Sequence, residues 1–530
     1  MSRAPYPTLF PTPGKPPHPA AAVILLRPGA PDRVYTVRRS PKLRFLGGFG
    51  GYPGGRVDRE DATLAGVEDR QSEAAGRVGA ARELFEEAGV LICPGADRVD
   101  DEELDRARKD LLDGRASFAA VCERLGVDPV PAPEALQMAG RWITPYFSPL
   151  RFDTYYFVHV YRGAREPSVW PGELVEGGWR TPAEVLASWE ETGSWLAPPV
   201  TETLCVLAGG IDPLAELLPR LHAVADTLGH PFHPVRMRHG VRMLPLASRA
   251  LPPAIYTNVF VVGERELVVV DPGASPGEPR ELLWAALDGL LAEGRRLRAA
   301  ILTHHHLDHV DSAVALRDRY EVPIVAHGET ARALREARHH PYRPDLAGFE
   351  VDGELNDGER LELDGGFVLE VLHTPGHARG HICLHEHRSG SLFVGDLVSG
   401  LSPVIIDPPE GDMGQYLVSL QRVFELGDLG LFPGHGPPAV SSQFRVGLLR
   451  KHRLWRRQRV LQALAAAPGG LAADGLIPAV YEDVPATLHP FAARSLHAHL
   501  LQLASEGAVE QLDGDRYRLR ADDGDRNVTA

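Results

Sequence analysis

The chain has few cysteines and lacks any long apolar run. Its four cysteines lie far apart and form no CxxC pair: Cys93, Cys122, Cys205 and Cys383. This spacing argues against a disulfide framework and against a thiolate zinc site, and it fits a reducing, cytoplasmic environment. Nowhere do about 18 apolar residues follow one another, and the proline-rich start has no apolar core. We therefore expect neither a membrane span nor an export signal.

Positive charge is also scarce. The chain has 71 acidic and 56 basic residues and a formal net charge of −15. This balance disfavours a general binder of polyanions but leaves room for a local basic patch. A chain of 530 residues is too long for one hydrophobic core, and we find no internal repeat, so several α/β domains are expected.

Local patterns divide the chain into segments. Apolar strand-like stretches alternate with helical ones in the first half, whereas a stretch before residue 250 has histidine, proline and arginine but no period. A polar tail follows the last hairpin pattern. The predicted divisions are a disordered 1–18, a first domain 19–225, a linker 226–249, a second domain 250–440, a mostly helical tail domain 441–520 and a disordered 521–530.

The densest chemical signal is ILTHHHLDHV, residues 301–310. His304 and His306 are two positions apart behind a strand, so both imidazoles point the same way while His305 points away. Asp308 and His309 follow once the chain turns. Imidazole and carboxylate without nearby cysteine suit a catalytic site for zinc or a similar metal. The alternative is a solvated polar loop.

Three further polar residues each follow a strand, two of them in glycine-rich turns: His377, Asp396 and His435. With Asp271 in VVVDPG, the order of these motifs over 250–440 resembles the metallo-β-lactamase superfamily. The resemblance implies an αβ/βα sandwich, two Zn²⁺ or similar ions, and hydrolysis by an activated water for which Asp308 is catalytic. It also implies the ligands of each ion: His304, His306 and His377 for one, Asp308, His309 and His435 for the other, and Asp396 between them.

The superfamily resemblance leaves the substrate open, because this fold hydrolyses lactams, thioesters and phosphodiesters alike. Seven arginines or lysines lie between residues 445 and 459. The pattern of a helix followed by a hairpin near the end predicts a winged helix. Together with the metal motifs they resemble the branch similar to β-lactamase-like protein 2, some of whose members are single-strand-selective endoribonucleases. The alternative is a solvated helix face or a packing surface.

One predicted helix of that tail carries positive charges that would suit a phosphodiester substrate. Arg450, Arg453 and Arg457 fall on one helical face with Arg456 beside it. Such a face predicts a positive stripe that could guide a nucleic-acid backbone.

A second cluster is acidic. In AARELFEEAGV, Glu83, Glu86 and Glu87 stand at i, i+3 and i+4 on one helical face, where hard oxygen ligands suit Mg²⁺ or Mn²⁺ and a bound diphosphate. The run from Arg82 to Val90 resembles the second half of the Nudix box, which implies an α/β/α sandwich with these three glutamates catalytic and metal-binding. The alternative is a solvated acidic helix face.

Two departures from the Nudix box affect this assignment. Asp61 stands where the box has glutamate, and 20 residues rather than seven precede Arg82, an insertion of 13 that we expect to lengthen the loop before the helix. Nudix proteins of the coenzyme A diphosphatase-like branch have a similarly long gap, and the resemblance to them covers about 18–210. The alternative is a degenerate domain that only binds nucleotides or supports its neighbour.

These patterns predict a bifunctional hydrolase. One site would cleave the diphosphate of a nucleotide or coenzyme A derivative, and the other a small ester or thioester. The first alternative is a single-stranded RNA endonuclease with the Nudix domain as a nucleotide-binding module; the second, a non-enzymatic scaffold, would make the metal motifs coincidental. No membrane partner is expected, and the sequence leaves the natural substrates and oligomeric state open.

Overall fold

The computed structural model describes residues 16–43, 46–145, 148, 150–170, 172–191, 193–228, 234–337 and 349–520. The chain forms two compact units that meet between residues 244 and 245. Apart from 16–18, where β1 begins at His18, the segments predicted to be disordered at the two ends lie outside the described residues. No helix in the described ranges is long and apolar enough to cross a membrane.

The first unit is built around one mixed sheet in the order β3-β2-β1-β6-β5, with β4 paired to β1 and β7 to β2. Its strands are β1 (His18–Arg27), β2 (Arg33–Arg39), β3 (Gly50–Gly51), β4 (Gly54–Arg56), β5 (Gln137–Ile143), β6 (Phe152–Val160) and β7 (Leu174–Arg180). Its helices are α1 (Arg59–Leu64), α2 (Glu73–Ala88), α3 (Asp101–Leu112), α4 (Phe118–Leu125), α5 (Pro182–Glu191), α6 (Pro198–Leu207), α7 (Leu214–Leu228) and a 3-10 turn at Ala96–Arg98.

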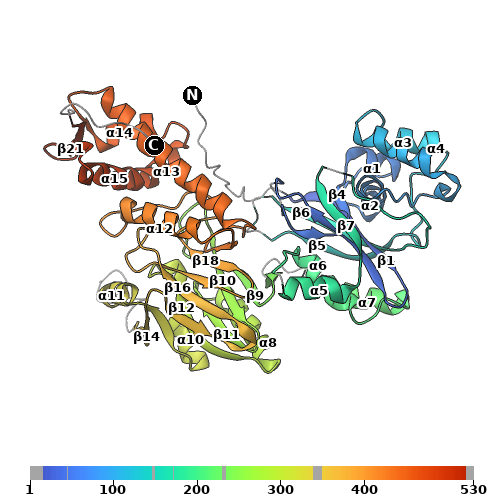
Figure 1. Ribbon diagram of the computed structural model, residues 1–530, viewed down its shortest axis with the longest axis horizontal. Coiled ribbons are helices and arrows are strands. Elements are labelled where there is room, and N and C mark those ends of the chain that lie inside the picture. The colour runs from blue at the N-terminus through green and yellow to red at the C-terminus, as the bar shows by residue number, and fades with distance from the viewer. Residues whose placement is uncertain are drawn as a thin grey trace. The chain divides into compact units, whose positions relative to one another are not determined.

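Both faces of this sheet are apolar, and helices cover each of them (Figure 1). Val23 and Leu25 of β1 pack into a core with α2, while Ile24 and Leu26 pack into a second core with α5, α6 and α7. Alternate residues of a strand face opposite sides, so one continuous apolar run supplies two cores. The unit is the predicted α/β/α sandwich.

The 20 residues between Asp61 and Arg82 contain both loop and helix. After α1 ends at Leu64, residues 65–72 are a loop, and α2 begins at Glu73, where the Ser72 side chain caps the helix by accepting from the Ala75 N–H. The extra residues thus lie in a loop before α2 as well as in its first turn. The segment EAAGRVGAA is rich in alanine, which favours a helix, and Ala75, Ala80 and Ala81 are buried against the sheet.

Residues 235–433 hold two sheets, in the orders β14-β13-β12-β11-β10-β9-β8 and β15-β16-β17-β18-β19. The strands of the first are β8 (Val235–Arg238), β9 (Val241–Ala247), β10 (Tyr256–Gly263), β11 (Glu266–Val270), β12 (Arg296–Leu302), β13 (Ile324–His327) and β14 (Gly353–Leu355). Those of the second are β15 (Arg360–Glu362), β16 (Val368–His373), β17 (Ile382–Glu386), β18 (Ser391–Gly395) and β19 (Gly430–Pro433). The helices are α8 (Glu278–Ala292), α9 (Leu307–Val310), α10 (Ala313–Tyr320), α11 (Gly328–Ala337), α12 (Met413–Glu425), α13 (Ser442–Ala465) and a 3-10 turn at Asp364–Gly366.

The two sheets share one core, with helices on their outer sides. The Phe260 ring of β10 lies 5.1 Å from Phe393 of β18 and 5.9 Å from Phe432 of β19, centroid to centroid. Tyr416 of α12 and Val446 of α13 pack in a further core with β18 and β19. On the other sheet α8 and α10 contact β12, and α11 contacts β13. This is the predicted αβ/βα sandwich.

The expectation of an irregular linker over 226–249 is wrong for part of that stretch. It contains the β8–β9 hairpin, in which Val235 pairs with Met243 and Arg238 with Val241 around Gly240 at φ +69°. The strand signal is the alternation of buried Val235 and Met237 with arginine. Neighbouring proline and histidine obscured this period of two in the sequence.

The C-terminal part forms the predicted winged helix. Its elements are the second half of α13, α14 (Ala473–Val480), α15 (His489–Ser505), a 3-10 turn at Ala486–Leu488, β20 (Leu471–Ala472), β21 (Val509–Gln511) and β22 (Arg516–Leu519). The strands pair in the order β20-β22-β21. Val446 of α13 packs with α12 and Val460 with α14 and α15, so one helix belongs to both cores.

The predicted positive stripe on α13 is not formed. Arg453 and Arg456 are only 3% and 2% exposed, and Arg457 pairs with Glu506 at 2.6 Å. Arg453 donates to the Val404 carbonyl, and Arg456 pairs with Asp483. The reason is helical spacing, because these two positions continue the buried face of the helix.

Candidate functional site

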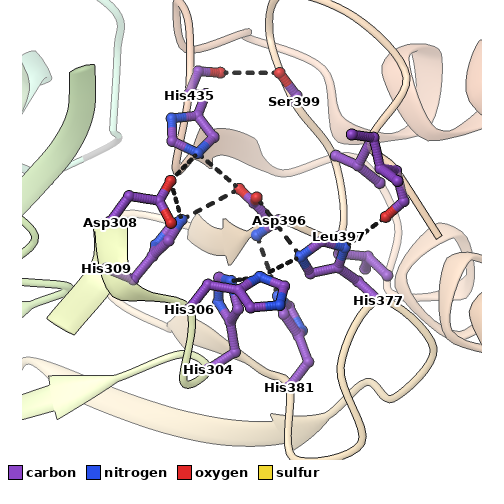
Figure 2. A network of polar contacts seen from close by, with 12 residues as sticks. His304, His306, Asp308, His309, His377, His381, Asp396, Leu397, Ser399 and His435 are labelled. Carbon is purple, nitrogen blue, oxygen red and sulfur yellow. Dashed lines mark hydrogen bonds and ion pairs between the residues drawn. The ribbon is translucent and has the colours of Figure 1, made fainter. Parts of the chain in front are cut away.

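The predicted metal ligands, from the segments that follow β12, β16, β18 and β19, lie in one cluster (Figure 2). Three sets of ligand atoms each lie within 4.8 Å of one another: His304, His306 and His377; Asp308, His309 and His435; His304, His309 and Asp396. Asp396 faces both sides, since Oδ2 lies 3.7 Å from His377 Nε2 and Oδ1 lies 3.4 Å from His435 Nε2. All seven predicted residues of this site are thus brought together.

Asp271, which follows β11, organises the loop after β12. Its carboxylate accepts from the Thr303 backbone N–H at 2.7 Å, from the Thr303 hydroxyl at 2.7 Å and from His309 Nδ1 at 2.9 Å. The chain passes so closely that a Cβ at Gly273 would lie 1.7 Å from the Asp308 carbonyl oxygen. Glycine is therefore required there, and the DPG turn positions the ligand loop.

Hydrogen bonds fix the tautomers of four imidazoles. His377 Nδ1 and His435 Nδ1 each lie 2.8 Å from a backbone carbonyl, which can only accept, so each carries its proton on Nδ1. His309 Nδ1 donates to Asp271, and His304 Nδ1 donates to the Thr303 hydroxyl at 3.0 Å. All four therefore point Nε2 into the cluster, which is the nitrogen left to bind a metal when Nδ1 is held by a hydrogen bond.

Some nitrogen atoms of the cluster lack a hydrogen-bond donor, and a bound metal ion would satisfy them. His306 Nδ1 lies 3.1 Å from His304 Nε2 and 3.0 Å from His377 Nε2, although those two nitrogens carry no proton to donate. Burial and the neighbouring imidazoles hold the pKa of His304 well below its usual range, so it is neutral. His309 Nε2 and Asp396 Oδ1 are buried and face each other at 3.6 Å, too far apart for a hydrogen bond. Buried unsatisfied acceptors are costly, and cations would satisfy them.

Two residues of this site escaped the sequence reasoning. His381 is fully buried; its Nδ1 donates to Thr374 at 2.9 Å and its Nε2 accepts from the Asp396 N–H at 3.1 Å, which holds the Asp396 backbone in place. The repeated GH in PGHARGH was its only signal. Glu410, from an irregular loop, lies 2.8 Å from His305 Nε2 and 4.0 Å from His306 Nε2, and nothing local in the sequence points to it.

The second candidate site lies on α2 of the first unit. Arg82 donates through Nη1 to Glu83 at 2.9 Å and Glu86 at 3.1 Å, and Glu87 accepts from the Gly54 N–H at 2.7 Å. A Cβ at Gly55 would lie 2.5 Å from the Glu83 carboxylate, so the β4 backbone approaches as closely as glycine allows. Burial raises the pKa of Glu87 to about 7 and raises that of Glu83.

The three carboxylates are close to one another but are not assembled around one point. Among the described residues of this unit, no set of three metal-ligand side chains has its ligand atoms within 4.8 Å. Arg82 forms ion pairs with both Glu83 and Glu86. The pKa values of Glu83 and Glu87 are nevertheless raised, because burial outweighs the positive charge near these carboxylates. A divalent cation would relieve this imbalance.

Comparison with known proteins assigns the second unit. Residues 252–435 match the family described as Metallo-beta-lactamase superfamily. A Haemophilus influenzae protein named Hydroxyacylglutathione hydrolase GloC is 33% identical over 187 residues, which is 34% of this chain and 84% of that protein. The chain belongs to the metallo-β-lactamase superfamily. The fold of this superfamily implies binding of divalent metal ions.

Other matches extend this assignment. Residues 66–207 match the family described as NUDT19 Nudix domain, and residues 473–517 the Beta-lactamase associated winged helix domain. A Gallus gallus protein named Acyl-coenzyme A thioesterase MBLAC2 is 36% identical over 34% of this chain and 72% of that protein. The Drosophila melanogaster Beta-lactamase-like protein 2 homolog is 27% identical over 48% of this chain and 84% of that protein. This superfamily member is a hydrolase with a Nudix and a winged-helix domain, which confirms the prediction of an enzyme.

Proposed function

We propose that the chain is a bifunctional hydrolase of coenzyme A compounds. The metallo-β-lactamase site would cleave an acyl thioester, and the Nudix site would cleave the diphosphate of a nucleotide or coenzyme A derivative. The observation that carries the first half is the convergence of fixed imidazole lone pairs with Asp308 and Asp396. Hydrolysis of an acyl-coenzyme A releases free coenzyme A, whose diphosphate suits the second activity.

The geometry of the cluster supports the ligand assignment that the superfamily resemblance implies. His304, His306 and His377 would hold one zinc ion, Asp308, His309 and His435 the other, and Asp396 would contact both. When bound, two such ions activate water and stabilise the negative charge that develops on the substrate oxygen. Asp271, Thr303 and the two carbonyl groups keep the imidazoles in the ligating tautomer, and His381 keeps Asp396 in position.

On the Nudix side, Glu83, Glu86 and Glu87 would hold Mg²⁺ or Mn²⁺, and Arg82 would position the first two carboxylates. Hard carboxylate oxygens are the ligands that such ions prefer, and a bound ion would offset the mutual repulsion of these partly buried groups. The close approach of Gly55 leaves the Glu83 carboxylate no room for another side chain on that side.

A thioester is favoured over RNA by the surface of α13. Arg453 and Arg456 are buried with their own partners, and Arg457 is paired, so this helix lacks the row of available cations that a phosphate backbone needs. Glu410 adds negative charge beside His305 and His306. Two relatives at 33% and 36% identity bear names that describe thioester hydrolases.

A substrate panel tests the proposal. Zinc- and magnesium-loaded protein would be assayed on an acyl-coenzyme A, on free coenzyme A and on single-stranded RNA, with Asp308→Ala and Glu86→Gln as a matched pair. We expect thioester hydrolysis to be lost only in the first variant and diphosphate cleavage only in the second. RNA cleavage without thioester cleavage, with an affinity that falls by about 0.7 log units per log unit of salt for each phosphate contacted, would overturn the first half.

A further inference from the structure

A second group of metal-ligand side chains lies on the β16–β17 hairpin. Glu370 of β16 is directly opposite His385 of β17 in the antiparallel ladder. His387 follows two residues after His385, and its backbone N–H continues the ladder by donating to the Val368 carbonyl at 3.0 Å. Residues two apart in an extended strand face the same side, so both imidazoles lie on the face of Glu370.

The three side chains are already close enough to share one ion. Glu370 Oε2 lies 2.7 Å from His387 Nε2, and the two imidazole rings are 4.2 Å apart between centroids. One ligand atom from each of the three residues lies within 4.8 Å of the others.

We propose that Glu370, His385 and His387 bind a single divalent transition-metal ion of the zinc class. Two imidazoles and one carboxylate form a ligand set that zinc accepts, with the remaining position left for water. The site is distinct from the cluster around Asp396, because His381, which borders that cluster just before β17, is four residues from His385, about 13 Å along an extended chain. Three ligands on one rigid ladder need little reorganisation to bind.

One neighbouring cation competes for this site. Arg360 of β15 is opposite Glu370 in the ladder, and its Nη2 lies 3.3 Å from the same Oε2 that faces His387. The arginine is 61% exposed, so its guanidinium can turn into solvent when an ion takes the carboxylate. Removing this arginine should therefore strengthen metal binding, which a merely structural ion pair would not do.

Zinc stoichiometry of the full chain tests the proposal. The protein would be saturated with zinc, freed of excess, and analysed for bound metal at a fixed free zinc concentration set by a chelator. We expect the His385→Gln/His387→Gln variant to hold one equivalent fewer than the wild type while thioester hydrolysis is unchanged. Arg360→Gln should lower the free zinc concentration needed to fill that equivalent by several-fold.

The control is His497→Gln, a histidine of α15 outside every metal-ligand group found among the described residues. It should retain the full stoichiometry. If the double variant does not fold, Glu370→Gln makes the same test at a single position. Equal zinc content in the wild type, the double variant and Glu370→Gln, or no effect of Arg360→Gln on affinity, would overturn the proposal.

Discussion

Asp61 and Arg82 form a bidentate ion pair although 20 residues separate them in the chain. Arg82 Nε lies 2.9 Å from Asp61 Oδ1 and Nη2 lies 2.9 Å from Oδ2, and the carboxylate is fully buried. The pair leaves Nη1 to face Glu83 and Glu86. The shorter acid and the insertion, the two departures from the Nudix pattern, are thus compatible with an arginine fixed beside Glu83 and Glu86.

Both removing the charge of Asp61 and lengthening its side chain should therefore lower the free energy of unfolding. Asp61→Asn breaks a buried ion pair, and we expect a loss of about 3–5 kcal/mol in unfolding free energy. Asp61→Glu restores the usual residue of the motif but overfills a closed site, since Asp61 Oδ2 lies 3.1 Å from where a Cβ of Gly79 would be; we expect a loss of about 1–3 kcal/mol. Denaturant unfolding measures both.

Asp58→Asn is the matched control for these changes, because Asp58 is 66% exposed and lies 3.9 Å from the same guanidinium. Its substitution should change stability by less than about 1 kcal/mol. Equal losses at positions 58 and 61 would contradict the assigned pairing.

Glu86→Gln and Glu87→Gln should each abolish magnesium-dependent diphosphate cleavage and leave the metallo-β-lactamase site active. An amide keeps the shape of the side chain but removes the charge that a hard cation requires. Both activities would be measured on the same preparation. Loss of both from one substitution, in a protein that still melts like the wild type, would indicate a single composite site.

Asp308→Ala should remove one of the two ions and with it most hydrolysis of the thioester. The side chain lies 3.2 Å from His435 Nε2, and an alanine offers no ligand atom in its place. Elemental analysis should find about one equivalent less zinc than in the wild type. Full zinc content together with full activity would refute the ligand assignment.

The winged helix should be sensitive to acid because of His499. This side chain is fully buried, both ring nitrogens lack a hydrogen bond, and burial followed by Arg453 and Arg456 lowers its pKa to about 3. The unfolded chain takes up this proton near pH 6.5 and the folded chain only near pH 3, so stability present above pH 6.5 is lost as the pH falls through that window.

At pH 5 the loss from His499 alone is about 2 kcal/mol relative to pH 7. His499→Leu should remove this part of the pH dependence without creating an unpaired polar group. Hydrogen exchange of α15 amides at pH 5 and pH 7, corrected for intrinsic rates, measures it. The same acid sensitivity in the leucine variant would show that another group titrates.

Arg456→Ala should destabilise the winged helix rather than weaken substrate binding. The guanidinium pairs with Asp483 at 2.8 Å and lies over the Tyr481 ring, and its removal leaves a carboxylate and a carbonyl unpaired. A loss of about 2–4 kcal/mol is expected. Arg450→Ala, at a more exposed position of the same helix, should have little effect on stability. An unchanged melting curve for Arg456→Ala would instead support the predicted role of Arg456 in substrate binding.

The sequence located strands and the polar residues at their ends because these signals are local, and the resemblance to known families supplied the sandwich folds. Apolar runs followed by turns placed β1, β11 and β12, and a polar residue at a strand end is visible without knowing its neighbours. The signal that failed depends on contacts, because the β8–β9 hairpin lies within an apparent linker.

What the sequence determined by itself is the chemical character of each segment, because residue type and spacing fix which side chains share a strand or helix face. What only the tertiary structure decided is which of those faces is exposed and which distant groups meet. Arg453 and Arg456 are as cationic in sequence as any others, yet packing buried them. His381 and Glu410 reach the cluster only because strand pairing and an irregular loop bring them there. Hydrogen bonds and burial between distant segments depend on the folded structure, so a local sequence pattern does not reveal them.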